Sequence, residues 1–207
     1  MVFTPVNRET WAREEYFEHY FSAQPCSYSM CVKLDITPIL QRGQKLYPTM
    51  LYAITAAVNR HEAFRYAINA QGQLGLYSQM LPCYTVFHKD THTFSTIWTA
   101  FCQDYDAFCA AYEADLAAYG DKPGFMAKPG LPENHFNVSM IPWTTFEGFN
   151  LNLEKGYAYL LPIFTLGRYV EADGKYLIPL ALQVHHAVCD GYHACQFIHD
   201  LQALIAR

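Results

Sequence analysis

The chain is short of charge, of long apolar runs and of basic stretches, and each shortage excludes a class of protein. Only 16% of its 207 residues are charged and the net charge is −5, so the composition gives no reason to expect a nucleic-acid partner. No apolar run approaches the ~18 residues of a membrane-spanning helix. The N-terminus lacks the basic start and apolar stretch of a secretory signal. We therefore expect a cytoplasmic protein without membrane or nucleic-acid partners.

The cysteines show no metal-ligand or disulfide pattern. There are seven of them, an odd number at scattered positions, and without a signal sequence reduced thiols are expected. Cys189, His193 and Cys195 lie close together, but no Cys-x-x-Cys pair accompanies them. This spacing does not fit a zinc site, and we expect no bound metal.

What the chain has instead is apolar and aromatic surface. Hydrophobic residues make up 52% and aromatic residues 16%, whereas ~25% of an average protein is charged. Such a chain buries much of its surface in an oligomer, lines an apolar pocket, or does both. There are no repeats and no linker rich in Gly, Ser or Pro, so a single domain over residues 1–207 is expected.

The most informative segment is His185-His186-Ala-Val-Cys-Asp190-Gly191. It follows an apolar run at residues 176–184 that predicts a buried strand, and it precedes a segment with apolar residues at helical spacing. Histidine titrates near neutral pH, and a strand end holds a side chain rigidly. The pattern therefore indicates a base for acyl transfer with a carboxylate nearby. The alternatives at this point are a structural core histidine and half of a metal site.

The periodicity along the chain predicts a mixed α/β protein. We expect a large, mainly antiparallel mixed sheet with helices packed on it in a second layer, and hairpins at Gln71-Gly72 and Asp173-Gly174. The expected strands span residues 26–36, 64–69, 74–79, 84–88, 135–141, 159–169 and 176–184. The expected helices begin near Trp11, span 48–61 and 95–118, and follow Gly191.

The sequence resembles the chloramphenicol acetyltransferases. The likeness includes QVHHAVCDGYHACQFIHDLQ at residues 183–202 and continues, in order, through residues 11–30, 46–65, 84–95, 132–152 and 161–169. The short motif His-x-x-x-Asp-Gly also occurs in the acyltransferase cores of 2-oxo acid dehydrogenases and in condensation domains of peptide synthetases, which share the fold. The chain length and the flanking segments favour the chloramphenicol enzymes.

The resemblance implies a CoA-dependent acyltransferase fold and a homotrimer with an active site at each subunit interface. The reaction would be O-acetylation of chloramphenicol by the co-substrate acetyl-CoA, which gives antibiotic resistance and needs no metal. His186 would take the proton of the acceptor hydroxyl as it attacks the thioester, without a covalent enzyme intermediate. His185 would be supporting structure.

The resemblance also assigns roles around His186. Asp190 would pair with Arg13 and hold the backbone of the site, rather than orient His186 as in a Ser-His-Asp triad. Ser139 would donate to the oxyanion of the tetrahedral intermediate, and Thr165 would hold a water near it.

Further positions match the walls of the family's binding sites. Tyr47 and Trp143 match the coenzyme A channel. Three positions depart from the family pattern: His19 and Gln24 stand where aromatic and aliphatic residues are usual, and Met126 where a Phe is common. The resulting, more polar lip of the acceptor pocket would weaken chloramphenicol binding or admit another alcohol. The positions that match the acceptor pocket are Tyr20, Cys26, Thr85, Phe94, Phe149, Leu151 and Ile163.

Three other functions are open. The same mechanism could serve another alcohol, which the motif does not specify. A drug-binding protein without turnover would not need His186, Ser139 and the Arg13–Asp190 pair together. A subunit of a larger acyltransferase assembly would call for a lipoyl or linker domain, which the sequence does not show.

Overall fold

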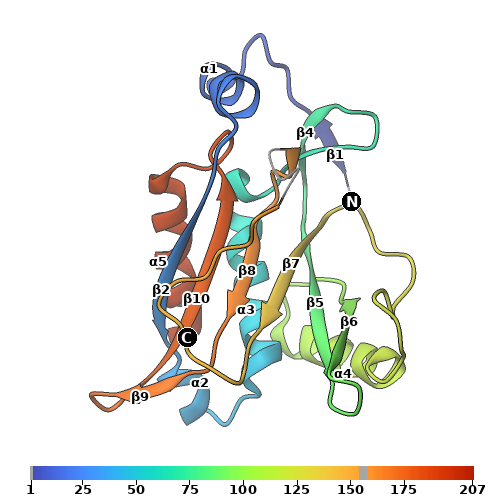
Figure 1. Cartoon of the computed structure of the whole chain (residues 1–207), viewed down its shortest axis with the longest axis vertical. Coiled ribbons are helices and arrows are strands. Elements are labelled where there is room, and N and C mark those ends of the chain that lie inside the picture. Colours follow the sequence, from blue (N-terminus) through green and yellow to red (C-terminus); the bar gives the residue numbers. More distant parts are fainter. Residues whose placement is uncertain (1, 154–157) are drawn as a thin grey trace.

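The computed structural model describes residues 2–153 and 158–207, which form two β-sheets and several helices (Figure 1). The helices are α1 (Glu14–Glu18), the π-helix η1 (His19–Ala23), α2 (Thr37–Gln41), α3 (Leu46–Arg60), the 3₁₀ turn η2 (Glu62–Phe64), α4 (Tyr105–Tyr119) and α5 (Gly191–Ala206). The strands are β1 (Phe3–Pro5), β2 (Ser27–Asp35), β3 (Tyr66–Ile68), β4 (Leu74–Tyr77), β5 (Leu81–His88), β6 (Thr93–Trp98), β7 (His135–Met140), β8 (Ile163–Leu166), β9 (Val170–Ala172) and β10 (Lys175–His185).

The larger sheet is mixed and mainly antiparallel, as expected. Among the described residues it has seven strands in the order β2-β10-β8-β7-β5-β6, and β9 pairs with the beginning of β10. Only β7 runs parallel to its neighbours, β5 on one side and β8 on the other. A small sheet, β1-β4-β3, lies beside it. The predicted α/β class is confirmed, and β10 is central because it pairs with β2, β8 and β9.

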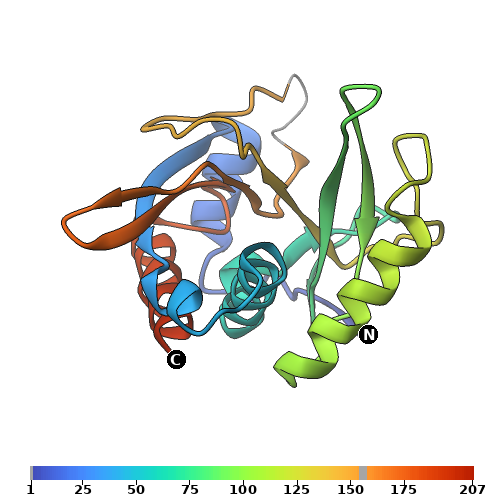
Figure 2. The ribbon, with the colours of Figure 1, turned by 90° about the horizontal axis from the view of Figure 1, so that it is seen from below.

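The helices cover one face of the large sheet. Figure 2 shows α2, α3, α4 and α5 on the same side of it. Ile178, Leu180 and Leu182 alternate along β10 and are completely buried against this layer, as a period of two along a half-covered strand requires. This is the helix-covered face, and the main hydrophobic core lies beneath it.

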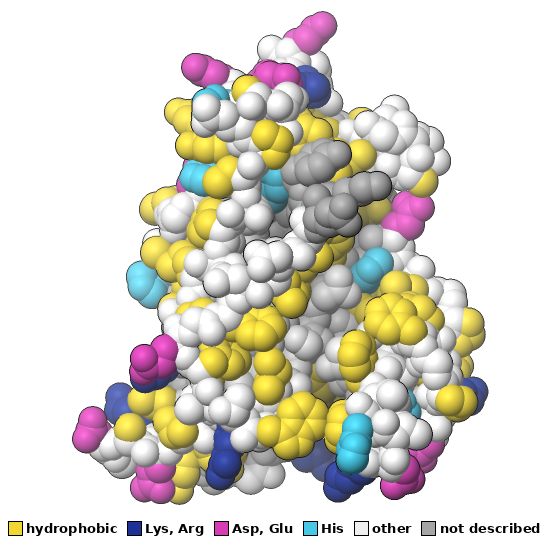
Figure 3. Space-filling view, in the orientation of Figure 1, with side chains coloured by type: hydrophobic (Ala, Val, Ile, Leu, Met, Phe, Trp, Pro, Cys, Tyr) yellow, Lys and Arg dark blue, Asp and Glu magenta, His cyan; other side chains and the backbone are white. Residues whose placement is uncertain are grey.

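In residues 2–153 and 158–207, no helix covers the opposite face of the sheet, and we call it the bare face (Figure 2). The loop after β7 passes in front of it (Figure 1), with the Leu151 N–H donating to the side-chain oxygen of Gln183 on β10 at 3.0 Å. Figure 3 shows apolar side chains gathered over this side, with a hollow between them. Large apolar residues exposed on it or on its loops include Phe87, Phe94, Trp143 and Leu151.

One predicted helix is wrong in its first part. Residues 95–98 lie in strand β6, where Ser95 and Ile97 are completely buried and Thr96 between them is 8% exposed. The helix that follows, α4, begins only at Tyr105, where the Asp104 side chain accepts the Ala107 N–H at 2.8 Å as an N-cap. Pairing of β6 with β5 outweighed the helical spacing of the aromatic residues.

The other boundaries differ less. The strand expected at 159–169 begins at Ile163 and ends at Leu166. The first helix begins at Glu14, not near Trp11, and continues as a π-helix. The expected hairpin at Asp173-Gly174 joins β9 to β10, with both turn residues at positive φ. No helix in the described ranges is long and apolar enough to cross a bilayer, and all seven cysteines are free thiols.

Candidate active site

The two histidines of the motif lie where β10 ends and the chain turns toward α5. His185 is the last residue of the strand, and its carbonyl accepts the N–H groups of Val188 and Cys189 at 3.2 and 3.1 Å. The N–H of His186 donates to the carbonyl of Cys26 at 2.9 Å, at the start of β2. The backbone of His186 is therefore fixed by the sheet itself.

Aromatic rings fix the orientation of the His186 ring. Tyr20 of η1 stacks on it with centroids 4.0 Å apart and planes 10° apart. Tyr28 of β2 meets it edge-on at 5.3 Å, and the Tyr28 hydroxyl donates to the Cys189 carbonyl at 3.2 Å. Nδ1 of His186 is buried while the side chain keeps 29% exposure. The part of the imidazole that reaches solvent is therefore the edge away from Nδ1.

An ion pair closes the turn around His186. The Arg13 guanidinium donates to both carboxylate oxygens of Asp190, at 2.7 and 3.0 Å, and to the carbonyls of His186 and Ala187 at 3.4 Å. This fork-to-fork geometry is the strongest form of ion pair. Hydrogen bonding to Arg13 lowers the pKa of Asp190, and the same bond raises the pKa of Arg13.

Asp190 lies close to His186 but forms no hydrogen bond with its ring. Its Oδ1 lies 3.3 Å from Nδ1 of His186, and Nδ1 has no hydrogen-bond partner. Both oxygens of Asp190 point to Arg13 instead. The structure thus places Asp190 as the anchor of the turn. We call His186, Asp190, Arg13, Tyr20 and Tyr28 the histidine cluster.

The second predicted group lies in the middle of the sheet. Ser139 of β7 and Thr165 of β8 are directly opposite in the parallel register, and their hydroxyls are 3.0 Å apart. Thr165 is 2% exposed and Ser139 is half-buried. We call these two residues the serine pair. A hydroxyl hydrogen-bonded to a neighbouring hydroxyl keeps a defined direction, which a donor to a reacting oxygen needs.

One chain does not bring the two groups together. Thr165 pairs with Ala181 of β10, which puts the serine pair level with Ala181, five residues before His186. Five residues at ~3.3 Å and two strand spacings of ~4.8 Å separate the Cα atoms of Ser139 and His186 by about 19 Å. A base and an oxyanion donor on one tetrahedral intermediate must lie much closer than this.

The predicted acceptor-pocket residues divide between the two groups. Tyr20 and Cys26 belong with His186, whereas Ile163 is level with Gln183 and Leu151 is bonded to that glutamine. Thr85 follows Tyr84, the partner of Val138, and so lies beside Ser139. Phe94 and Phe149 lie further out, against Phe125 and Phe146 respectively.

The two predicted coenzyme residues lie on opposite faces of the sheet. Tyr47 packs on Tyr84 at the helix-covered face, and its hydroxyl donates to the Thr85 carbonyl at 3.4 Å; burial raises its pKa. Trp143 is 59% exposed and meets Phe87 edge-on at 4.6 Å on the bare face. The structure does not bring these two side chains together.

The three departures from the family pattern also have defined places. His19 begins η1 and packs edge-on against Tyr20 at 4.7 Å, and its carbonyl accepts the Gln24 N–H at 2.7 Å. Met126 is 43% exposed and its sulfur accepts the Thr96 hydroxyl at 2.9 Å. His19 therefore contacts the ring that stacks on His186, whereas Met126 lies beside the edge strand β6.

Sequence reasoning missed two residues that shape this region. Tyr28 orients the His186 ring and ties β2 to the turn. Gln183 holds the loop after β7 against the bare face through Leu151. The available signal for Gln183 was a polar residue in an otherwise apolar strand. Tyr28 gave no signal, because a tyrosine in a strand is ordinary.

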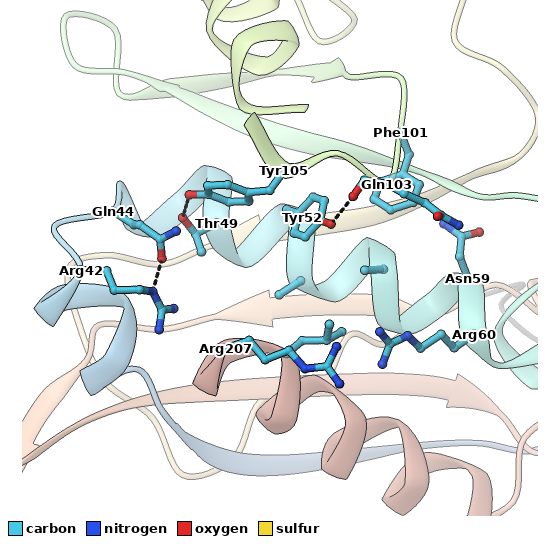
Figure 4. Close-up of a pocket in the computed structure, with 13 residues that line it drawn as sticks. Arg42, Gln44, Thr49, Tyr52, Asn59, Arg60, Phe101, Gln103, Tyr105 and Arg207 are labelled. Atoms are coloured by element: carbon cyan, nitrogen blue, oxygen red, sulfur yellow. Dashed lines mark hydrogen bonds between the residues drawn. The ribbon is translucent and has the colours of Figure 1, made fainter. Parts of the chain in front are cut away.

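A cavity of ≈ 560 Å³ lies elsewhere, on the helix side. Figure 4 shows it between α3 and the end of α5, with the guanidinium groups of Arg60 and Arg207 facing one another. None of the predicted site residues is among its lining, so it is not the place of the predicted chemistry. In the described part of the chain, no cluster of three or more His, Cys, Asp or Glu side chains is arranged to hold a metal.

Comparison with known proteins gives one consistent family. The family model described as "Chloramphenicol acetyltransferase" matches residues 1–202. A curated chloramphenicol acetyltransferase of Campylobacter coli is 60% identical over 207 residues, with both chains covered completely. Another, of Vibrio anguillarum, is 61% identical over 99% of this chain and 95% of its own length.

The fold agrees with a solved structure. A chain described as a chloramphenicol acetyltransferase superposes with a TM-score of 0.89, covering 99% of this chain and all of its own, at 22% identity. Because the identity is only 22%, this similarity is evidence for the fold alone. It confirms the predicted acyltransferase architecture.

Proposed function

This chain belongs to the chloramphenicol acetyltransferase family, and on that premise we propose that it transfers the acetyl group of acetyl-CoA to a hydroxyl of chloramphenicol. Acetylation removes the free hydroxyl of the drug, which supports a role in antibiotic resistance. The observation that carries the proposal is the closed turn at His186, with its Arg13–Asp190 ion pair, in a chain related to these enzymes over its whole length.

His186 acts as the general base in this proposal. Its exposed ring edge takes the proton of the acceptor hydroxyl while the hydroxyl oxygen bonds to the thioester carbon. The tetrahedral intermediate then collapses, the bond to sulfur breaks, and the coenzyme leaves as a thiol with the proton that His186 returns. Such a base contributes ~10²–10⁴-fold to the rate. Direct transfer needs no covalent acyl-enzyme because both substrates bind together.

Ser139 supplies the donor for the oxyanion. Negative charge develops on the thioester oxygen, and a preorganised hydroxyl stabilises it more in the transition state than in the ground state. The contact with Thr165 at 3.0 Å supports this role with the Thr165 hydroxyl as donor to Oγ of Ser139, since that direction leaves the Ser139 hydrogen for the oxyanion. We assign Thr165 to holding this hydroxyl and a nearby water.

We infer that the working site lies between two copies of the chain, in a homotrimer. The ~19 Å between Ser139 and His186 in one chain supports this inference, because residues from neighbouring copies can meet where those of one chain do not. The apolar side chains that Figure 3 shows on the bare face make it the kind of surface that a second copy covers. A head-to-tail contact between identical chains closes into a ring when the rotation between neighbours allows it, and the family resemblance implies three subunits.

The binding residues follow from this arrangement. Tyr20 and Cys26 line the acceptor pocket on the histidine side, and Thr85, Leu151 and Ile163 line it on the serine side, with Phe94 and Phe149 at its margin. We assign the exposed ring of Trp143 to the coenzyme, and Tyr47 to holding the Thr85 strand from behind through the carbonyl contact. The whole chain, residues 1–207, works as one domain in the cytoplasm, where acetyl-CoA is available.

The decisive experiment is release of coenzyme A thiol from acetyl-CoA, measured with and without chloramphenicol. We expect release that depends on chloramphenicol and is lost in His186→Ala. If the wild-type protein releases no thiol with the drug, the acceptor assignment is wrong. The polar side chains of His19 and Gln24 favour another alcohol in that case, and a panel of alcohols would identify it. Tight binding of the drug without thiol release would indicate sequestration.

A further inference from the structure

A third histidine lies against the ion pair and has no role in the mechanism above. His193 is in the first turn of α5, and its Nδ1 accepts the backbone N–H of Asp190 at 3.1 Å. The same nitrogen is 3.7 Å from the carboxylate oxygen Oδ2 of Asp190. Asp190 is thus held at its side chain by Arg13 and at its backbone by His193, whose reach back to the N-cap residue is one half of a capping box.

This hydrogen bond defines the protonation state of His193. An Nδ1 that accepts a hydrogen bond carries no proton, so the ring is the neutral tautomer with its hydrogen on Nε2. A protonated ring would place one N–H against another, and the bond to Asp190 would be lost.

The charges around His193 favour the neutral ring. Burial lowers its pKa, and the positive charge of Arg13, from the segment before α1, lowers it further. Asp190, the N-cap residue of α5, raises the pKa of His193, while His61 after α3 lowers it. His61 is itself 2.9 Å from Asp200 of α5.

Protons reach the ring from a small cavity. His193 lies in the wall of a space of ≈ 480 Å³ together with Arg13 and His61. The other charged groups in that wall are Arg60 and Glu62, and on the helix itself the Tyr192 ring meets His193 edge-on at 5.8 Å. The side chain keeps 33% exposure, so solvent exchanges with it although its Nδ1 faces inward.

We propose that His193 is a positioning residue for acetyl transfer: its neutral ring fixes the backbone of Asp190, and protonation of that ring releases Asp190 and misplaces His186. The proposal rests on the proposed role of His186. It adds a second proton-sensitive group to the site, His193, which touches no substrate.

The first test determines the protonation state of the His193 ring and does not depend on acetyl transfer. Nitrogen-15 NMR of histidine-labelled protein distinguishes a bare Nδ1 from a protonated one. We expect His193, assigned by its loss in His193→Asn, to show the Nε2–H tautomer at pH 7. A protonated Nδ1 at pH 7 would overturn the proposal, whether or not the protein acetylates chloramphenicol.

The second test compares three variants in the thiol-release assay. His193→Asn keeps an acceptor near the position of Nδ1 but does not titrate, whereas His193→Leu has no acceptor. His199→Leu changes an exposed histidine of the same helix and is the matched control. We expect kcat to fall about tenfold in His193→Leu, because the Asp190 N–H loses its part-buried hydrogen-bond acceptor. It should stay within about threefold of wild type in His193→Asn and be unchanged in the control.

The pH profile separates positioning from mere helix stability. On the acid side kcat of the wild type should fall with a steeper slope than kcat of His193→Asn, because protonation of His193 adds a further loss of about tenfold that the asparagine cannot show. Equal slopes, or full activity in His193→Leu, would contradict the proposal. If the wild type releases no thiol at all, the proposed function fails and the NMR result alone decides the assignment of His193.

Discussion

The histidine cluster and the serine pair are held in place by different forces. At the end of β10 the chain leaves the sheet, and an ion pair, stacked rings and a backbone contact to Cys26 fix His186. In the middle of the sheet, strand register alone puts Ser139 opposite Thr165. Substitutions and pH should therefore disturb the histidine cluster through charge, whereas the serine pair should respond only to loss of its own hydroxyls.

The largest effect is expected from removal of the base. His186→Ala should lower kcat by about 10³-fold or more, near the upper part of the range for a general base. Its melting temperature should stay close to that of the wild type, because Arg13 and Asp190 remain paired. Steady-state thiol release and a thermal melt measure both quantities. Turnover within tenfold of wild type would remove His186 from the mechanism.

A somewhat smaller effect is expected at the serine pair. Ser139→Ala should lower kcat by ~10²–10³, the loss typical of one oxyanion donor, with the KM for the acceptor nearly unchanged. Thr165→Val is the matched control, since it removes only the neighbouring hydroxyl and should cost less. A kcat for Ser139→Ala within a few-fold of wild type would show that the oxyanion is stabilised elsewhere.

Breaking the ion pair should reduce both activity and stability, and this distinguishes the two regions. Asp190→Asn leaves Arg13 without its partner. Removal of one partner from a fully buried ion pair lowers the free energy of unfolding by ~3–5 kcal/mol. Loss of an exposed pair lowers it by only ~0–1 kcal/mol. Asp190 is 35% exposed and Arg13 17%, so we expect about 2 kcal/mol in chemical denaturation, and about tenfold in kcat. Intact activity with an unchanged melting curve would contradict the anchoring role of this pair.

The smallest effect is a pH dependence of stability that belongs to the histidine cluster alone. Arg13 lowers the pKa of Asp190 below its ordinary 3.8, so the folded state favours the ionised carboxylate. The stabilisation from this ion pair is complete above the pKa that Asp190 has in the unfolded chain. It disappears as the pH falls through the lower pKa that Asp190 has in the folded protein. The stability difference between wild type and Asp190→Asn should therefore stay constant above about pH 5 and shrink below about pH 4. Ser139→Ala should differ from wild type by the same amount at every pH.

The sequence predicts the local features of the site well. An apolar strand, two histidines and an Asp-Gly pair before a helix place His186 at a strand end, and the structure has this arrangement. The hairpin at Asp173-Gly174 follows from turn chemistry in the same way. Such features depend on neighbours in the chain.

Long-range features could not be read from periodicity. Arg13 and Asp190 are 177 residues apart, and only the family resemblance paired them. Residues 95–98 have apolar spacing compatible with a helix, and their pairing with β5 made them a strand. The order of strands places the serine pair far from His186 within one chain, which no local pattern indicates. His193 appeared in the sequence only as part of a poor metal motif.

If each site takes His186 from one copy of the chain and Ser139 from another, as we propose, two inactive variants should complement one another in a mixed oligomer. His186→Ala and Ser139→Ala chains would be co-expressed with different affinity tags, and mixed oligomers purified through both tags. In a mixed trimer of the two variants, one interface of the three regains an intact His186 and an intact Ser139. We predict recovery of about a third of the wild-type activity per mixed trimer. Activity no higher than that of the separate variants would show that both residues act within a single chain, and would contradict this account.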